Sequence, residues 1–466
     1  MPGVEQTVRV VTAADERAGA AVVERVIGRL IPFIFCCYVV AYLDRVNVGF
    51  AARDLQRDLG LSDAAYGFGA GLFFLGYFLF EIPSNLLLQR FGARRWIARI
   101  MVVWGLVSMG TMFVQGETSF YVSRVLLGLA EAGFFPGIIL YLTYWIPAAD
   151  RARAGALFMT AIPVAVIIGS PVSEALLALD GWLGLHGWQW LFLIEGVPAV
   201  ILGVACLWRL TDRPEQADWL KPAEREWLTR QLEQERLARQ AHQTAHGLKT
   251  LLTGKVWLLS TIYFLNNLVT YGIFLWLPKI LSEVSGLEGL RLSGITMIPF
   301  IVALVGMVVI GRHSDRTRER KLHVAACALT GAIGLTLAAF SQDSTLLIVC
   351  AFTLSQLGQR SILSVFWAIP PLFLGGTAAA AAIAFINSLG NLGGAAGPTI
   401  MGRLRSISED YTTGLLTLAA VLVVEAILVL TIRLPKQPAT TPATTPAAAP
   451  AEATGATAAA LPAAGR

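Results

Sequence analysis

The chain is poor in charged residues. Only 14% of its 466 residues are Asp, Glu, Lys or Arg, whereas soluble domains carry about 25%. Hydrophobic residues make up 55%, and the mean hydropathy is +0.63. This composition excludes an ordinary soluble domain and predicts a polytopic membrane protein. The net charge of +5 comes mostly from arginines that flank apolar runs, so we expect a lipid bilayer and no nucleic acid as partner.

Cysteine and histidine are also scarce. All five cysteines lie inside apolar runs and no CxxC occurs, which predicts packing residues rather than disulfides. None of the five histidines has metal-ligand spacing. The sequence also lacks a nucleophile–base pair and a phosphate-binding loop, so we expect no enzyme activity, no catalytic residue, no metal and no cofactor. A membrane receptor or membrane enzyme is the least favoured class.

Apolar runs long enough to cross a bilayer follow one another with short polar breaks, which predicts an all-α membrane protein of twelve transmembrane helices. The predicted spans are 29–51, 66–89, 96–115, 118–145, 153–178, 188–210, 256–281, 292–311, 322–341, 345–372, 376–402 and 412–433. The predicted domains are a cytosolic N-terminal tail (1–28), a six-helix bundle (29–210), a central cytosolic loop (211–254), a second six-helix bundle (255–434) and a disordered C-terminal tail (435–466). Within the loop, residues 222–241 mix Glu and Arg at helical spacing, which is typical of a solvated surface helix.

A repeated loop supports the six-plus-six division. Residues 85–95 follow the second span and residues 311–321 follow the eighth, with arginines or lysine at matched positions. Two equivalent loops predict two related bundles. Charge also gives the orientation, because cytosolic loops are rich in Lys and Arg. Most basic loops fall on the side of residues 90–99, which places both termini in the cytosol. The arginines that run against this trend are Arg53, Arg57, Arg403 and Arg405.

Ionisable side chains occur inside two of the predicted spans. Asp44 and Arg45 are adjacent in the first span, and Arg124 and Glu131 lie on one face of the fourth. Charges at such depth are costly and mark paired, solvated or functional groups. Closed salt bridges that lock two helices together are one interpretation. Buried ion pairs contribute little net stability, however, which favours a functional role.

The chemistry of these groups suits proton-coupled transport. Counted from the outer side, Asp44 and Arg124 lie at the same depth, with Glu131 nearer the midplane. A carboxylate that changes partner can take up or release a proton. A guanidinium on a cavity wall offers two parallel donors to a substrate carboxylate. We therefore expect Asp44 to face Arg124 and Arg45 to face a central cavity.

Two motifs carry a family resemblance. Y-L-D-R-V-N at residues 42–47 and R-x-x-x-G-x-x-E-A-x-x-F-P at residues 124–136 resemble the anion:cation symporter family of the major facilitator superfamily. The loop G-x-x-x-D-R-x-x-x-R-K at residues 311–321 resembles the signature loop of that superfamily, whereas the first copy has Asn85 and Gln89 in place of Gly and Asp. The resemblance covers residues 29–434 and extends to bacterial permeases for tartrate, phthalate, hydroxyphenylacetate and galactonate. It implies a major facilitator fold.

The resemblance also implies residue roles. Proton coupling would involve Asp44, Glu131 and Arg124, the last as partner of Asp44, while a gating loop would include Asp315 and Arg316. Substrate binding would involve Arg45, Tyr42, Tyr77, Ser364, Trp367 and Asn387. Where galactonate carriers have a polar amide, this chain has Ile162-Pro163, which argues against a heavily hydroxylated sugar acid. Three other carboxylates lie within or near apolar segments, have no cation on their own helix face and are expected to be structural: Glu81, Glu195 and Glu425.

The leading hypothesis is therefore a secondary active transporter, a symporter in the bacterial inner membrane. It would take up a small organic anion, a carboxylate, together with protons by alternating access, and we expect it to act as a monomer. The alternative is a proton-driven efflux antiporter of the same superfamily. Residues 169–174 offer a partial version of the Gly-Pro motif that such antiporters carry in the fifth helix.

Overall fold

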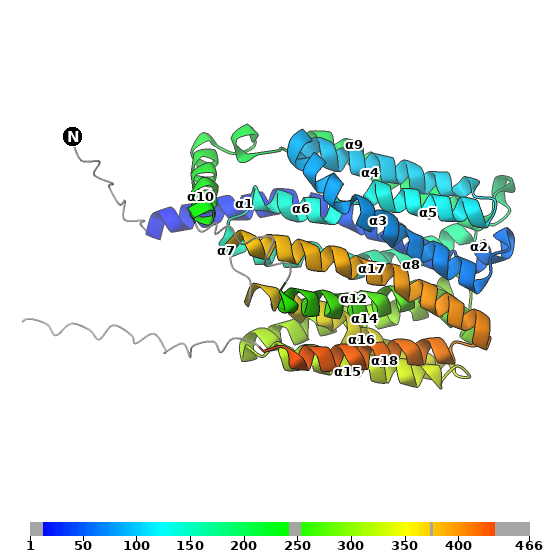
Figure 1. The fold of residues 1–466 in the computed structure, drawn as a ribbon. Helices are drawn as coiled ribbons and strands as arrows, with labels where there is room; N and C mark the ends of the chain where they lie inside the picture. Colours follow the sequence, from blue (N-terminus) through cyan, green and yellow to red (C-terminus); the bar gives the residue numbers. More distant parts are fainter. Residues whose placement is uncertain (1–12, 242–252, 373–375, 434–466) are drawn as a thin grey trace, which may run out of the picture. The chain divides into compact units, whose positions relative to one another are not determined.

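The computed structural model describes residues 13–241, 253–372 and 376–433. Residues 13–432 belong to one compact unit of long helices that run side by side (Figure 1). No strand occurs in these described ranges. The predicted disordered tail (435–466) lies outside the described residues, as do the first twelve residues of the predicted N-terminal tail.

The helices before the central loop account for the first six predicted spans. They are α1 (Ala13–Phe50), α2 (Ala52–Leu59), α3 (Asp63–Phe91), α4 (Ala93–Gly110), α5 (Glu117–Glu131), α6 (Phe134–Thr143), α7 (Ala148–Met159), α8 (Ala161–Leu177) and α9 (Gly187–Arg209). Helix α1 begins well before the predicted start at residue 29, so most of the predicted tail is helical. The predicted surface helix is confirmed as α10 (Pro222–Ala241).

The remaining helices form the second half. They are α12 (Gly254–Phe274), α13 (Leu277–Ser285), α14 (Gly289–Thr317), α15 (Lys321–Ala339), α16 (Thr345–Phe366), α17 (Gly376–Ser408) and α18 (Thr412–Thr431). Eleven helical segments of the described chain are long and apolar enough to cross a membrane. Helix α17, with 33 residues, packs along α3 and α12 and completes the set of twelve. The predicted fold class is thereby confirmed.

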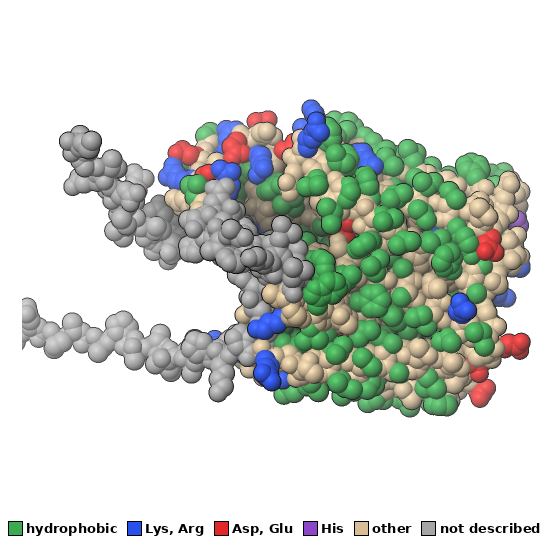
Figure 2. Space-filling model, in the orientation of Figure 1, with side chains coloured by type: hydrophobic (Ala, Val, Ile, Leu, Met, Phe, Trp, Pro, Cys, Tyr) green, Lys and Arg blue, Asp and Glu red, His purple; other side chains and the backbone are tan. Residues whose placement is uncertain are grey.

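The surface has the polarity of an integral membrane protein. In Figure 2, apolar side chains cover the long flank of the helices, while most charged side chains gather at the two ends. Large hydrophobic residues of the long helices are well exposed, for example Leu79 at 60% and Val305 at 59%. An apolar surface of this extent is unfavourable in water and favourable against lipid.

Some of the membrane-spanning segments are broken in the middle. The fourth breaks at Ala132 and Gly133, between α5 and α6. Gly133 has a φ of +85°, which side-chain-bearing residues rarely adopt, and it packs against Ser84. The break makes Glu131 the last residue of α5. Since the negative end of the helix dipole lies there, a buried carboxylate at this position calls for a cation nearby.

The two halves are joined tightly at the end of the molecule that carries α2, opposite the end that carries α10 (Figure 1). Lys279 of α13 forms an ion pair with Asp63 of α3 and donates to Gln56 at 2.5 Å. Arg53 reaches Glu288 at 2.5 Å. Along the same interface, a side chain on Gly71 would meet the Ala395 carbonyl of α17 at 2.5 Å, so glycine permits this close approach. We call this set of contacts the α2-end latch.

The α2-end latch explains two arginines that run against the charge trend. Arg405 of α17 lies 3.6 Å from Glu283 and 4.0 Å from Asp63, and Arg53 pairs with Glu288 across the halves. Both arginines therefore have acidic partners at this end. Their position reflects contact between the halves rather than loop orientation.

Candidate transport site

The centre of the site is an ion pair between α1 and α5. Arg45 donates through Nε to Glu131 Oε1 at 3.0 Å and also through Nη2 to the same oxygen. Its Nη1 reaches the Tyr271 hydroxyl of α12 at 3.4 Å. Arg45 is 8% exposed and Glu131 is fully buried. The pair therefore lies between the two halves and touches both of them.

Aromatic rings enclose the Arg45 guanidinium. Its Cζ lies 5.9 Å from the ring of Tyr42, 5.3 Å from Tyr77 and 5.5 Å from Phe73. Ring faces attract a cation and exclude water. The structure thus brings together three of the predicted substrate-binding residues, namely Arg45, Tyr42 and Tyr77.

Asp44 points away from Arg45 and contacts α4. It accepts hydrogen bonds from the Trp104 indole and the Ser108 hydroxyl, and from the Asn47 amide at 2.9 Å. Its carboxylate is 1% exposed and is held by neutral donors. Asp44 and Arg45, although adjacent in sequence, therefore belong to two separate networks.

The predicted direct pair of Asp44 with Arg124 is absent from this conformation. The Arg124 atoms Nε and Nη1 are buried without a hydrogen-bond partner among the described residues. The guanidinium instead lies 5.2 Å from the ring of Phe73. The carboxylate of Asp44 already accepts hydrogen bonds from α4, so it makes no ion pair with Arg124 in this conformation.

The correction has a geometric cause. Side chains on a helix lean toward its N-terminus. Helices α1 and α5 run in opposite directions because they belong to the first and the fourth membrane span, and successive spans alternate in direction. Arg45 and Glu131 therefore lean toward each other along the membrane normal, and Arg124 leans away. Counting depth by backbone position alone assigned the wrong partner.

The second half contributes a polar contact that the sequence analysis undervalued. Asn387 of α17 donates to Glu81 of α3 at 3.0 Å, and Ser388 donates to the same carboxylate at 2.7 Å. Glu81 is 3% exposed. We expected it to be structural because its own helix offers no cation, but its partners come from the opposite half. Asn387 thus reaches the interface between the halves, and its role in a substrate cavity stays a prediction.

Two other predicted substrate residues contact neighbours within the second half. Ser364 is exposed, and its hydroxyl donates to the Ser361 carbonyl of its own helix at 2.8 Å. Trp367 packs edge-on against Tyr263 with ring centroids 4.9 Å apart. The described contacts of both residues are made within the second half.

An arginine of the second half was not predicted as a site residue. Arg360 of α16 is 4% exposed and borders a small cavity between the halves. Its Nη2 atom has no hydrogen-bond partner among the residues that the structure describes. The sequence signal is the same one that singled out Arg45, namely an arginine inside an apolar span.

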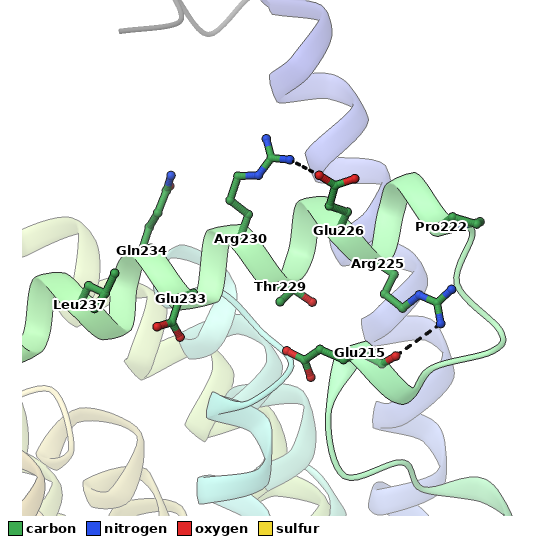
Figure 3. A pocket seen from close by; sticks show the side chains of 9 residues that line it. All are labelled: Glu215, Pro222, Arg225, Glu226, Thr229, Arg230, Glu233, Gln234 and Leu237. Atoms are coloured by element: carbon green, nitrogen blue, oxygen red, sulfur yellow. Dashed lines mark hydrogen bonds and ion pairs between the residues drawn. The ribbon is translucent and has the colours of Figure 1, made fainter. Parts of the chain in front are cut away.

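A shallow groove along α10 belongs to the surface rather than to this site. Figure 3 shows its lining of alternating Glu and Arg side chains, with Arg230 paired to Glu226 at 2.5 Å and Arg225 donating to the Glu215 carbonyl at 3.4 Å. These contacts are local to the central segment. The groove holds solvated ion pairs of the kind expected on a surface helix.

The predicted gating loop lies at the α10 end of α14. Asp315 forms an ion pair with Arg320 at 2.5 Å, and Arg320 also donates to Ser314 at 3.1 Å. Asp315 is well exposed. The charged side chains of the second copy of the repeat thus pair with each other in this conformation.

The chain is similar to known membrane transporters. Residues 34–398 match the family model described as the Major Facilitator Superfamily. The chain belongs to the major facilitator superfamily. It is 48% identical over 413 residues to a proposed tartrate transporter of Agrobacterium vitis, covering 88% of this chain and 91% of the relative. It is 40% identical to a quinolone resistance transporter of Acinetobacter baumannii, covering 87% of this chain and 94% of that one.

The solved structures show the same fold. The xylose transporter XylE of Escherichia coli, in a partially occluded inward open conformation, superposes with a TM-score of 0.70 at 15% identity, covering 88% of this chain and 99% of that one. Membership in the superfamily makes this chain an integral membrane transporter and not an enzyme. It also agrees with the expected organic acid permease family.

Proposed function

We propose that this chain is a proton-coupled symporter that takes up an organic carboxylate by alternating access. The observation that carries the proposal is the buried ion pair of Arg45 and Glu131 between the two halves. The name of the Agrobacterium relative, a tartrate transporter, agrees with a carboxylate substrate. The proposed domain organisation is the one predicted from the sequence, with two six-helix bundles joined by a central loop.

The ion pair provides a physical reason for coupling. Arg45 keeps its charge at any accessible pH, because guanidinium does not lose its proton in proteins. When Glu131 takes up a proton, Arg45 loses its counter-ion and an uncompensated charge is left in a buried place. A substrate carboxylate that binds Arg45 removes this cost. Proton and anion therefore bind together, and each is disfavoured alone.

Asp44 would be the second proton-linked group. Its acceptor contacts to Trp104 and Ser108 join α1 to α4, so a change in its protonation would alter how these helices pack. Arg124, which is buried nearby with two free nitrogen atoms, would serve as an alternative partner in another conformation. Asp44 thus acts through helix positions, while Glu131 acts on the substrate arginine directly.

The remaining assignments complete the model. Tyr42 and Tyr77 would line the substrate cavity from the first half, and Asn387, Ser364 and Trp367 would line it from the second. Asp315 and Arg316 would form the gating loop at the cytosolic side. The α10 end would face the cytosol, with both termini there, in the bacterial inner membrane, and the α2-end latch would then close the outer side. We expect a monomer.

Uptake into proteoliposomes tests the proposal. A panel of aliphatic and aromatic carboxylates is offered with and without an inward proton gradient. Accumulation of at least one acid above its external concentration, only when the gradient is present, is the expected result. Failure of every acid to accumulate would refute carboxylate symport.

A proton-driven efflux antiporter is the second candidate. The observation that favours it is the relative named as a quinolone resistance transporter, at 40% identity. The same Arg45–Glu131 site would then exchange a substrate acid against protons in the opposite direction. Quinolone accumulation in cells that express this chain distinguishes the two: lowered accumulation that a protonophore restores favours efflux.

A further inference from the structure

We infer that Arg360 is a second carboxylate-binding residue, and that the transported substrate is a dicarboxylate held between Arg45 and Arg360. The inference rests on the proposed function and deepens it, because it names the class of acid. The geometry that points to it is a buried guanidinium without an acidic partner, at a cavity between the two halves.

The surroundings of Arg360 leave its charge without compensation. Its Nε donates to Gln356 Oε1 at 3.2 Å, which is a neutral acceptor on the same helix. Its Cζ lies 4.9 Å from the ring of Phe274 and 5.7 Å from that of Phe300. No carboxylate forms an ion pair with it among the described residues. Ring faces and an amide stabilise a buried cation only partly. A bound anion would supply the negative charge that the described neighbours do not provide.

Two other buried cations, unlike Arg360, have an acidic partner in the structure. Arg45 is paired with Glu131, and Lys279 is paired with Asp63. The carboxylate of Glu425, which is buried in the same half as Arg360, accepts instead from Asn266 at 3.2 Å. An arginine guanidinium is a permanent cation in proteins. An anion supplied from outside the chain is therefore the natural partner.

The cavity beside Arg360 lies on the path that alternating access would open. Its lining comes from both halves of the chain: Ile162, Pro163 and Val166 of α8, Phe300, Ala303 and Met307 of α14, and Arg360 and Leu363 of α16. In this conformation its volume is about 20 Å³, which is room for a single water molecule. Separation of the halves would widen it, so an acid could enter as the transporter opens.

Arg360 and Arg45 are connected through one pair of aromatic rings. Arg45 lies beside Tyr42, Arg360 lies beside Phe274, and the centroids of these two rings are 5.8 Å apart. The other residues that line the cavity beside Arg360 are apolar, and Arg45 is not part of this lining. The two rings lie between the arginines in this conformation, so an acid with a carboxylate at each end would bridge them only once the halves separate. The apolar lining beside Arg360 would offer few donors to a polyhydroxylated body. The two ends would differ: binding at Arg45 requires a proton on Glu131, and binding at Arg360 does not.

Paired acids of equal chain length test the inference. Succinate and butyrate share four carbons and differ in the second carboxylate. Binding of each to purified protein is measured by calorimetry for the wild type, Arg360→Gln and Arg360→Lys, with Arg209→Gln as a matched loss of an exposed arginine elsewhere. We expect Arg360→Gln to weaken the binding of succinate at least about tenfold and to change the binding of butyrate by less than about twofold. Arg360→Lys should retain part of the preference for succinate.

The outcomes separate this inference from the proposed function. If Arg360→Gln weakens both acids equally, or neither, while the wild type binds carboxylates, the inference is overturned and carboxylate symport stands. If the wild type binds neither succinate nor butyrate, the inference is overturned, and carboxylate symport is decided by the proteoliposome panel of acids. Thermal unfolding of each variant, with a midpoint close to that of the wild type, shows that the fold is intact, and Arg360→Lys supplies a second variant should Arg360→Gln not fold.

Discussion

Each half of the molecule buries an arginine at the interface between the halves, but only the first half places a carboxylate beside it. Arg45 binds Glu131 of the same half, and three aromatic rings surround the pair. Arg360 contacts a neutral amide and two aromatic rings. The second half does contain a buried carboxylate, Glu425, but it lies against Asn266. The two arginines therefore have the same side-chain chemistry, but a carboxylate balances the charge of Arg45 only.

This difference suggests a division of labour. A cation with a resident carboxylate can bind a substrate anion only when a proton neutralises that carboxylate, so it couples two events. A cation without a resident carboxylate is available to the substrate at all times, so it can recognise the anion but cannot couple its binding to a proton. The first half would then provide the proton-dependent step, and the second half would provide selectivity. The following predictions alter one side of this comparison at a time.

Removal of Arg45 should have the largest effect. Arg45→Ala leaves Glu131 buried without its cation, and we expect uptake to fall by about 100-fold or more. Proteoliposome uptake at saturating substrate measures this. The double variant Arg45→Ala/Glu131→Gln is the control for stability: it should recover a normal yield of folded protein but no uptake. Undiminished uptake in Arg45→Ala would remove Arg45 from the site.

Glu131→Gln should make Arg45 resemble Arg360. The amide keeps the shape of the side chain but carries no charge, so Arg45 becomes a permanently free cation. We expect substrate exchange across the membrane to continue and proton-driven accumulation to fall by at least about tenfold. Counterflow and gradient-driven uptake, measured on the same vesicles, separate the two. Normal accumulation by this variant would contradict the coupling role of Glu131.

Asp44→Asn and Arg45→Lys should give different defects. Asp44→Asn retains most of the volume of the side chain and should uncouple transport from protons while binding persists. Arg45→Lys keeps the charge but loses the planar fork, so we expect weaker binding, by about tenfold, with coupling retained. Calorimetric binding and the dependence of uptake on outside pH measure the two effects. If both variants show the same defect, the separation of the two networks has no functional meaning.

Loosening the α2-end latch should have a smaller effect. Lys279→Met removes the cation that contacts Asp63 and Gln56 across the halves. We expect the closed conformation to lose about 1 kcal/mol, which would raise the labelling rate of a cysteine at the Ser282 position several-fold. The single Ser282→Cys protein provides the reference rate. An unchanged rate would show that these ion pairs do not hold the halves together.

Changes on α10 should have the smallest effect. Glu226 and Arg230 form an exposed pair on the surface of the central segment (Figure 3). Glu226→Gln should change stability by less than about 0.5 kcal/mol and leave uptake unaltered. Thermal unfolding and uptake check this. A clear loss of transport would indicate a role for the groove that the site geometry does not suggest.

The sequence by itself determined the fold class and the candidates. Long apolar runs must become helices in a bilayer, since a helix satisfies its own backbone hydrogen bonds, and charges such as Asp44, Arg45, Arg124 and Glu131 stand out against that background. The same rule applies to Arg360. Hydropathy therefore identified the buried charges of the first half, and it offered the same signal for Arg360, which the sequence analysis did not single out.

Only the tertiary structure decided which charges meet. Sequence depth pairs Asp44 with Arg124, but side chains lean toward the N-terminus of their helix, and the antiparallel α1 and α5 bring Arg45 to Glu131 instead. The role of Glu81 depends on α17, which is more than 300 residues away in the sequence. Whether a buried charge is compensated depends on neighbours from other helices, and no local pattern contains them.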